Sequence, residues 1–467
     1  MAHLETPAER DNRMNLTTPR AAVIIPTHNR RDFLARALDA LERQTCPAEA
    51  FEVVVVANAC SDDTAAFVAG RRDCAGYPLR LVDRSEPGAS GARNAGAERT
   101  RASLLVFLDD DIEASPGFVE AHLEAHRRYG GRHGASCVAI GYLPAALQTH
   151  RDLFAVTLRG WWEAMFDQMR RPGHRFRYTD LLSGNFSMSR ELFMATGGFD
   201  VRYRCHEDYE LGHRLIKAGA EFVFVEDASG VHSDHTRVER ACGRKRDEGY
   251  ADVQLSQQYP ELRTGLLLAR PRTLKQRVLQ WAAFHAPRIG DAAAQTLMDL
   301  LPAIERSGFR MVWLRVLYAV LGYWYARGLA DALPRQSEVE RLLEGAWEER
   351  RACDERRLSV PLDDGVDAAE RLLDEHRPMA AWLMIEDRPF AELAYVPGAE
   401  PLAGRHLRQS LMTDVPRKYV AALIEAGRLS VLPRATDPSR TDLAFRESAA
   451  GQPSTTRPGV YGDASSI

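Results

Sequence analysis

Hydrophobic residues between residues 21 and 108 come in short runs separated by segments with helical periodicity. The runs at 21–26, 53–56, 79–82 and 104–108 are rich in Val, Ile and Leu, which is typical of buried strands. After the first run, hydrophobic residues recur at helical spacing, at Phe33, Leu34, Ala37, Leu38 and Leu41. This alternation predicts an α/β domain with a mostly parallel sheet that helices cover on both faces.

Changes in the pattern divide the chain into five parts. We expect a disordered N-terminal segment (1–20), an α/β domain (21–265), a helical region (266–358), a small α+β module (359–433) and a disordered tail (434–467). In the module, residues 382–396 predict two strands joined by a polar Arg-Pro turn, and a helix follows near Lys418 to Ala426.

Composition restricts the class of protein. Of the 467 residues, 45% are hydrophobic and 27% are charged, which favours a globular chain with a sizeable core over a disordered or fibrous one. The net charge of −4 is too close to zero for the whole chain to act as a nucleic-acid polycation. The seven cysteines are scattered singly, so we expect reduced thiols and no structural zinc site.

The sequence predicts a cytoplasmic protein with at most peripheral membrane contact. The first twenty residues lack the apolar run of a secretory signal. The most apolar stretch, 311–326, is interrupted by Arg315 and is too short to span a bilayer. The aromatic and basic residues of 270–357 suit an interfacial helix at the inner face of a membrane, and a buried helical hairpin explains them equally well.

Asp109, Asp110 and Asp111 follow a predicted core strand directly. Open α/β sheets bind ligands at the carboxyl ends of their strands, and adjacent carboxylates are the oxygen ligands that Mg²⁺ and Mn²⁺ prefer. The alternative is an acidic helix cap, because a helical pattern begins shortly afterwards.

A second acidic pair, Glu207 and Asp208, precedes a predicted amphipathic helix. An aspartate there could accept a proton from a substrate hydroxyl, and helix capping is again the alternative. Upstream, SGNFSMSRELFMATGGFD (183–200) contains glycines that allow the backbone to approach a ligand closely.

Five segments occur in a characteristic order: IIPTHNRRDFLARALDAL, VVVVANACSDDT, GARNAGAERT before LLVFLDDDIEASPGF, LSGNFSMSRELFMATGGFD and HEDYELGHRLIKAG. Together they resemble the family 2 glycosyltransferases, which have the GT-A fold, a Rossmann-like mixed sheet. The resemblance runs from about Ala21 to Tyr259, roughly half of the chain.

The resemblance implies a nucleotide pocket lined by Pro26, Thr27 and His28. Asn58 falls where the family commonly has an aspartate that contacts the base. The usual paired acids are replaced here by Ala57 and Asn58, so the side-chain amide can hydrogen-bond a base edge but carries no charge.

For the diphosphate and the cation, the resemblance implies a further set of residues. Arg93 would be a charge partner for the aspartates or the diphosphate, and Asp109 and Asp110 would lie near the ribose. Asp111 would bind Mn²⁺ or Mg²⁺. His232 would approach the diphosphate or the cation, with His235 as its neighbouring competitor.

On the acceptor side, the resemblance implies that Asp208 is the catalytic base and that Glu207, Gly184 and Asn185 lie beside the acceptor. The reaction would move a sugar from a nucleotide-diphosphate sugar, with a UDP-sugar favoured, to a hydroxyl of a carbohydrate, a lipid-linked or another acceptor. In-line displacement would invert the anomeric carbon. The chain lacks the Gln-x-x-Arg-Trp motif and the membrane spans of the processive synthases, so single or few sugar additions are expected, in the synthesis of a bacterial-type polysaccharide, glycolipid or other glycoconjugate.

Other interpretations stay open. A nucleotidyltransferase on sugar phosphates would normally have a Gly-rich basic loop after the first strand, where this chain has PTHNRRD. A degenerate sugar-nucleotide-binding scaffold is the second rival. Trp161 and Trp162 could stack on a sugar or fill a core, and the basic run 237–246 could form a flap over the diphosphate or a solvated helix face.

Overall fold

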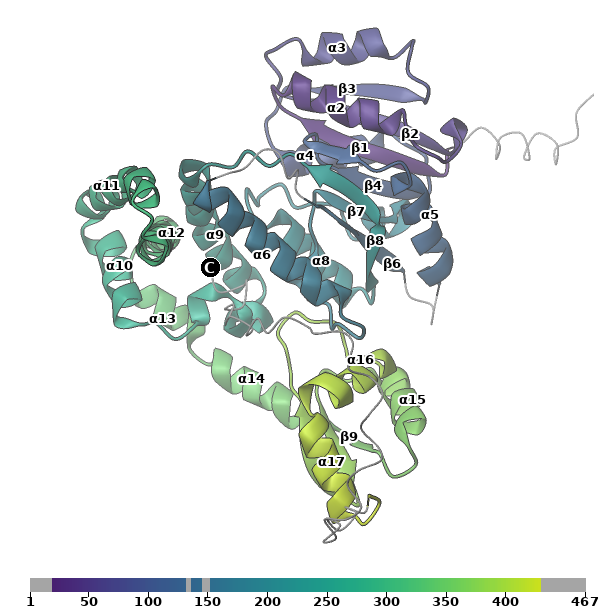
Figure 1. The fold of residues 1–467 in the computed structure, drawn as a ribbon, viewed down its shortest axis with the longest axis vertical. Coiled ribbons are helices and arrows are strands. Elements are labelled where there is room, and N and C mark those ends of the chain that lie inside the picture. The colour runs from purple at the N-terminus through teal and green to yellow at the C-terminus, as the bar shows by residue number, and fades with distance from the viewer. Residues whose placement is uncertain (1–18, 132–135, 145–151, 430–467) are drawn as a thin grey trace, which may run out of the picture. The chain divides into compact units, whose positions relative to one another are not determined.

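The computed structural model describes residues 19–131, 136–144 and 152–429 (Figure 1). The segments expected to be disordered, 1–20 and 434–467, lie outside the described residues except for residues 19 and 20. The described chain forms two compact units. The first holds the residues up to Cys353 together with Val396–Glu400, and the second holds Asp354–Tyr395 and residues 401–429.

The first unit is built on one mixed sheet in the order β3-β2-β1-β4-β7-β6-β8-β5. Its strands are β1 (Ala21–Thr27), β2 (Phe51–Asn58), β3 (Leu79–Arg84), β4 (Leu104–Leu108), β5 (Ile112–Ala114), β6 (Cys137–Tyr142), β7 (Asn185–Ser189) and β8 (Glu221–His232). The strands β3, β2, β1 and β4 are parallel, and β7 runs antiparallel to both β4 and β6. The mixed α/β fold of the prediction is therefore confirmed, and the carboxyl ends of β1, β2 and β4 lie at one edge.

Helices follow the strands as the hydrophobic pattern predicts. They are α2 (Arg31–Leu41), α3 (Thr64–Arg71), α4 (Ala89–Glu98), α5 (Phe118–Tyr129), α6 (Leu153–Arg170), α7 (Arg190–Ala195) and α8 (Glu207–Lys217). The buried face of α2 includes Leu34, Leu38 and Leu41. Helix α4 packs very closely on the sheet, because a Cβ at Gly96 would lie 2.5 Å from Cγ2 of Ile24. This packing fixes the position of α4, which carries Arg93.

The helical region packs on α9 (Val238–Gln258), which contains most of the basic run at 237–246. It comprises α10 (Leu274–His285), α11 (Pro287–Arg306), α12 (Arg310–Ala332), α13 (Ser337–Leu343) and α14 (Ala346–Glu355). Helix α12 is largely a core helix, since Trp313, Tyr323 and Tyr325 are at most 9% exposed. Gly249 of α9 allows the two helices to approach closely, because a Cβ there would lie 2.2 Å from the carbonyl oxygen of Tyr325.

The second unit is a small α+β module. It contains β9 (Leu358–Pro361), α15 (Val366–His376), β10 (Ala381–Ile385), β11 (Arg388–Leu393), α16 (Gly404–Gln409) and α17 (Pro416–Glu425). The two predicted strands are present, but the predicted Arg-Pro turn is wrong. Glu386 and Asp387 form the turn, with φ of 49° and 59°, and Arg388 begins β11. Two consecutive residues with positive φ give a hairpin turn that matches the twist of the strands, which a proline with its fixed negative φ cannot supply.

Candidate active site

Side chains from five elements of the first unit meet at the carboxyl ends of β1 and β4. Strand β1 ends at Thr27, the loop after it supplies Arg30, and β4 leads directly into Asp109, Asp110 and Asp111. The start of β7, the first turn of α8 and the end of β8 surround them. The sequence segments that the analysis singled out separately therefore converge on one place.

The three aspartates have different surroundings. Asp109 is partly exposed, with 36% of its side chain accessible, whereas Asp110 is buried. The Thr27 hydroxyl donates to Oδ2 of Asp110 over 2.7 Å, so the predicted nucleotide-pocket residue Thr27 is bonded to the acidic motif. Burial raises the pKa of Asp110 to about 7, against the lowering effects of Arg30 and Thr27.

Arg30 holds two of the aspartates together. Its guanidinium lies 2.8 Å from Oδ1 of Asp110 and 2.7 Å from Oδ2 of Asp111. The sequence analysis did not select Arg30 as a site residue. The available signal was its place in the loop after β1, which had already marked the neighbouring Thr27 and His28 as ligand-binding.

Asp111 faces His232 with its other oxygen. Oδ1 of Asp111 and Nε2 of His232 are 3.5 Å apart, and β5 and β8 pair at Ile112 and His232 to hold the two side chains together. Burial alone raises the pKa of Asp111, but His232 and Arg30 outweigh it and lower the pKa to about 2. For His232, burial lowers the pKa, but the neighbouring Asp111 outweighs burial and raises the pKa above its usual value.

The Asp111–His232 pair fits one side of a divalent cation site. Two neighbouring ligands bound at about 2.1–2.2 Å lie roughly 3 Å or more apart, close to the distance seen here. No group of three or more His, Cys, Asp or Glu side chains that could hold an ion occurs within residues 19–131, 136–144 and 152–429. Because Mg²⁺ is commonly held by one or two protein ligands together with substrate phosphates, the donor set fits a site that the substrate completes.

Arg93 joins the acidic motif to the second acidic pair. Its guanidinium lies 2.7 Å from Oδ1 of Asp109 and 3.2 Å from Oε1 of Glu207, and its side chain is only 5% exposed. Burial and the neighbouring Asp208 raise the pKa of Glu207 above its ordinary value. The prediction that Arg93 pairs with the aspartates matches this geometry, and the link to Glu207 adds to it.

Asp208 lies at the start of α8, close to the first residues of β7. Its carboxylate accepts from the backbone N–H groups of Ser183 (3.4 Å) and Tyr209 (2.9 Å). Gly184, which follows Ser183, lies against Asp109, since a Cβ at Gly184 would be 3.0 Å from Oδ2 of Asp109. Gly184 and Glu207 thus lie beside the acidic motif, and Asp208 is bonded to the residue before Gly184.

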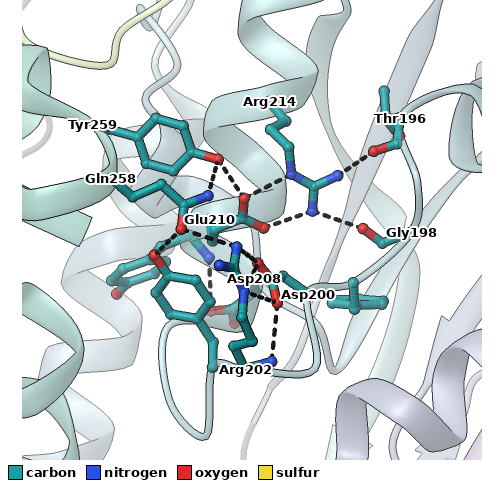
Figure 2. A network of polar contacts seen from close by, with 12 residues as sticks. Thr196, Gly198, Asp200, Arg202, Asp208, Glu210, Arg214, Gln258 and Tyr259 are labelled. Carbon is teal, nitrogen blue, oxygen red and sulfur yellow. Dashed lines mark hydrogen bonds and ion pairs between the residues drawn. The ribbon is translucent and has the colours of Figure 1, made fainter. Parts of the chain in front are cut away.

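Buried polar contacts fix the first turns of α8. Glu210 is fully buried and forms an ion pair with Arg214, which also donates to the carbonyl oxygens of Thr196 and Gly198. The Tyr259 hydroxyl donates to Glu210 over 2.6 Å. Figure 2 shows this network beside Asp208. The helix start that carries Asp208 is therefore anchored to the loop after α7 and to the end of α9.

The residue before this helix has a strained backbone. His206 has φ of 61°, in the left-handed region that a non-glycine residue enters at a cost. Its ring stacks on Tyr209 and lies 3.3 Å from Asp252 of α9, and the Tyr325 hydroxyl of α12 donates to Asp252 over 2.5 Å. The helical region therefore supports the conformation that presents Glu207 and Asp208.

The predicted base-contacting residue lies beside the loop after β1. The His28 ring is 2.7 Å from the carbonyl oxygen of Asn58, and Arg84 of β3 donates to the Asn58 side-chain oxygen over 3.2 Å. Pro26 is half-buried and His28 is exposed. His28 and Asn58 thus lie side by side, and Asn58 has Arg84 as a charged neighbour that the sequence analysis did not weigh.

Asn185 differs from the other predicted acceptor-side residues because its side chain is fully buried. Its amide donates to the carbonyl oxygen of Ala228 over 2.8 Å, and its oxygen is 3.0 Å from Nε2 of His122. Ser187 lies within hydrogen-bonding distance of both His122 and His126. The Asn185 side chain therefore connects β7 to His122 of α5 and to Ala228 of β8.

The adjacent tryptophans Trp161 and Trp162 have different surroundings, because only Trp162 lines a cavity beside His232. Trp162 lines it together with other residues of α6 and of the segment after β8: Ala155, Leu158, Arg159, Asp234 and Thr236. Trp161 instead stacks on Tyr318 of α12. His235 contacts the ring of Phe33 and does not line this cavity.

Part of the chain is similar to known proteins. Residues 22–197 match the model of the family described as Glycosyl transferase family 2. Validoxylamine A glucosyltransferase of Streptomyces hygroscopicus subsp. jinggangensis is 30% identical over 246 residues, which cover 48% of this chain and 57% of that protein. The uncharacterized glycosyltransferase YfnE of Bacillus subtilis is 27% identical over 261 residues, covering 46% and 65%. The chain therefore spans less than two thirds of the length of these relatives.

Among solved structures, the mannosyltransferase PcManGT from Pyrobaculum calidifontis, in complex with GDP-Man and Mn²⁺, is similar, with a TM-score of 0.42 and 15% identity. That similarity covers 66% of this chain and 87% of the other. The stretch from β1 to α7 carries Pro26, Thr27, His28, Asn58, the acidic motif and β7, and it coincides with the residues that match the family model. Residues 22–197 of this chain are thus similar to glycosyl transferase family 2.

Proposed function

We propose that the protein transfers a sugar from a nucleotide-diphosphate sugar to an acceptor hydroxyl with inversion of the anomeric carbon. The observation that carries the proposal is that the aspartates 109–111 and the acidic pair Glu207 and Asp208 lie together. Arg93 contacts both Asp109 and Glu207, and Gly184 lies between Asp109 and the backbone N–H that Asp208 accepts from. The proposed base and the proposed diphosphate-binding motif would thus share one site, as a displacement at a sugar carbon requires.

The donor would occupy the side formed by β1, β2 and β4. Pro26, Thr27, His28 and Asn58 would contact the nucleoside, with Asp109 and Asp110 near the ribose, and we favour a UDP-sugar. Asp111 and His232 would hold Mn²⁺ or Mg²⁺ against the diphosphate. When bound, the cation would neutralise negative charge on the departing diphosphate.

Asp208 would accept the proton of the attacking hydroxyl from the opposite face of the sugar. Its oxygens are oriented by the N–H groups of Ser183 and Tyr209, so the carboxylate has a fixed direction before the acceptor arrives. Glu207 and Gly184 would contact the acceptor, and Asn185 would hold β7 in place from below. Attack opposite the leaving group converts an α-linked donor into a β-linked product.

The acceptor would be a carbohydrate, a lipid-linked or another hydroxyl compound, in the synthesis of a bacterial-type polysaccharide, glycolipid or other glycoconjugate. We place the protein in the cytoplasm, because all seven cysteines are unpaired, as in proteins of reducing compartments. Glucose is the first donor sugar to test, because the relative that is 30% identical is a glucosyltransferase.

The test measures release of nucleoside diphosphate by the purified full-length protein, with Mn²⁺ or Mg²⁺ and a panel of sugar nucleotides. We expect turnover with one donor, and we expect Asp208→Asn to reduce it by about 10²–10⁴-fold while nucleotide binding by calorimetry is unchanged. Asp227→Asn, at an exposed aspartate of β8, is the matched control.

Three outcomes would contradict the proposal. Equal turnover by the Asp208→Asn variant would remove the base from the mechanism. Nucleotide binding without turnover, even with hydroxyl acceptors added, would support a scaffold. Release of pyrophosphate from a nucleoside triphosphate and a sugar phosphate would support nucleotidyl transfer.

A further inference from the structure

Exposed hydrophobic side chains gather on two helices of the helical region. On α10 these are Leu274, Val278 and Trp281, and at the start of α12 they are Phe309, Met311 and Val312. Leu274 is 79% exposed, Trp281 is 54% and Phe309 is 66%. Large apolar groups at such exposures, gathered on neighbouring elements, are typical of interaction surfaces.

The two groups lie on neighbouring helices. The Lys275 ammonium in the first turn of α10 donates to the carbonyl oxygen of Arg315 in α12 over 3.1 Å. Met311 precedes Arg315 by one helical turn, so the exposed start of α12 lies near the exposed start of α10. We call the six hydrophobic residues and their basic neighbours Lys275, Arg277, Arg310 and Arg315 the α10–α12 surface.

The spacing on α10 makes a narrow stripe. Leu274, Val278 and Trp281 stand at intervals of four and three residues and therefore share one helix face. The opposite face is buried through Gln280 and Ala283. Since 100° separates consecutive residues, Lys275 and Arg277 fall on the two flanks of the stripe, and both are exposed. Apolar residues flanked by basic ones are the pattern of helices that lie in a membrane interface.

The local charge has the sign that suits an anionic surface. Residues 270–315 contain eight Lys and Arg but only three Asp and Glu, although the whole chain has 61 basic and 65 acidic residues. Helix α10 itself has no acidic residue. No helix of the described residues is long and apolar enough to cross a bilayer, so contact through this surface would be with the interface and not by insertion across it.

We propose that the α10–α12 surface binds an anionic lipid membrane, with its hydrophobic side chains entering the interface and its basic side chains contacting the headgroups. This inference goes beyond the proposed function and does not depend on the chemistry at Asp111 or Asp208. A reaction with a lipid-linked acceptor would benefit from it, because the protein and the acceptor would then be concentrated at the same membrane.

The experiment is sedimentation of the full-length protein with phosphatidylcholine vesicles, with and without phosphatidylglycerol. We expect binding to the anionic vesicles that falls as salt is raised, and little binding to phosphatidylcholine alone. The double substitution Lys275→Glu and Arg277→Glu should weaken the partition by about tenfold or more, since each basic residue near such a surface contributes about 1 kcal/mol. Leu274→Ser with Trp281→Ser should also weaken it, and this loss should persist at high salt.

The matched control is Arg417→Glu with Lys418→Glu on α17, which makes the same charge change at an exposed pair of another helix. It should leave the partition unchanged. Equal binding by the Lys275→Glu/Arg277→Glu variant, or no binding of the wild type to anionic vesicles, would overturn the proposal. It would also be overturned if the wild type formed dimers that the Leu274→Ser/Trp281→Ser variant did not, because a second copy would then cover the surface. Unchanged circular dichroism would show that each variant is folded.

Discussion

The two acidic groups of the active site are held in place by different parts of the chain. Asp110 and Asp111 are bonded to Thr27 at the end of β1 and to Arg30 in the loop after it, both within the residues matched to the family. Glu207 and Asp208 lie outside that match, and contacts from α4, α9 and α12 hold the start of their helix. Apart from His232 of β8, the proposed donor side is therefore built from residues 22–197, whereas the proposed base side also depends on α9 and α12.

On the proposed function, this difference would separate the residues that bind the donor from those that complete the reaction. The proposed donor side uses strands and loops within residues 22–197, together with His232. The base side requires a strained His206 and a buried chain of contacts through Asp252 to Tyr325. Strain of this kind persists only where surrounding structure holds it. Changes in the helical region should therefore alter turnover more than donor binding.

The largest expected effect comes from Arg93, because it belongs to both groups. Arg93→Ala would leave Asp109 and Glu207 facing each other without their shared cation. Breaking a buried ion pair by removing one partner typically costs about 3–5 kcal/mol of stability, so thermal or urea unfolding should show a loss of that order. Arg99→Ala, at an exposed arginine just after the same helix, should have little effect. A fully stable Arg93→Ala protein would mean that the two groups are held independently.

Arg30 tests the donor side alone. Its guanidinium fixes Oδ2 of Asp111 and leaves Oδ1 toward His232, so Arg30→Ala should weaken Mn²⁺ binding in the presence of nucleotide by about 10–100-fold, as loss of a group that orients a metal ligand commonly does. Calorimetry or Mn²⁺ spectroscopy would measure this. Arg30→Lys should recover part of the affinity. The neighbouring Arg31→Ala, which removes an exposed pair with Asp63 and a contact with the Phe67 ring, is the control. Unchanged or tighter Mn²⁺ binding by Arg30→Ala would contradict the positioning role.

Tyr325 tests the base side from a distance. Tyr325→Phe removes the hydroxyl that donates to Asp252, which should cost about 1 kcal/mol of stability. Because Asp252 also faces His206, we expect a lower kcat with nucleotide affinity unchanged. Tyr250→Phe, at an exposed tyrosine of α9, should change neither. A loss of nucleotide affinity in Tyr325→Phe would show that the helical region supports the donor side as well.

Much of the fold and part of the site could be predicted from the sequence. Strand β4 and Asp109–Asp111 are adjacent in sequence, so a local pattern was enough to place the carboxylates at a strand end. The role of Arg30 was not apparent, because nothing in PTHNRRD shows which arginine turns toward the aspartates. The contact between His206 and Asp252 joins residues 46 positions apart, and helical periodicity does not report which helix faces lie together. The hairpin turn at Glu386 was missed because neither residue of the turn is a glycine.

The smallest effect on stability at neutral pH is expected from His122 and His126, which contact Asn185 and Ser187 of β7. Burial lowers the pKa of His122 to about 3 and that of His126 to about 4, so both imidazoles are neutral in the folded protein. The unfolded chain binds protons at these residues below about pH 6.5, and the free energy of unfolding should therefore fall as the pH is lowered from there toward 4. Each imidazole contributes a slope of up to about 1.4 kcal/mol per pH unit, in urea titrations at a series of pH values.

His122→Gln should remove one of these contributions while an amide still reaches Asn185 or Ser187. Above about pH 7 the free energies of unfolding of variant and wild type should differ by an amount that does not depend on pH. Between pH 6.5 and 4 the slope of the free energy of unfolding against pH should be smaller in the variant, by the contribution of one proton. An unchanged slope would mean that His122 is protonated in the folded state and that its contacts with Asn185 and Ser187 include a charge. If the slope falls as expected, the Asn185 side-chain oxygen accepts from a neutral His122 imidazole. Acid would then destabilise the start of β7, and with it the positions of both Asp109 and Asp208.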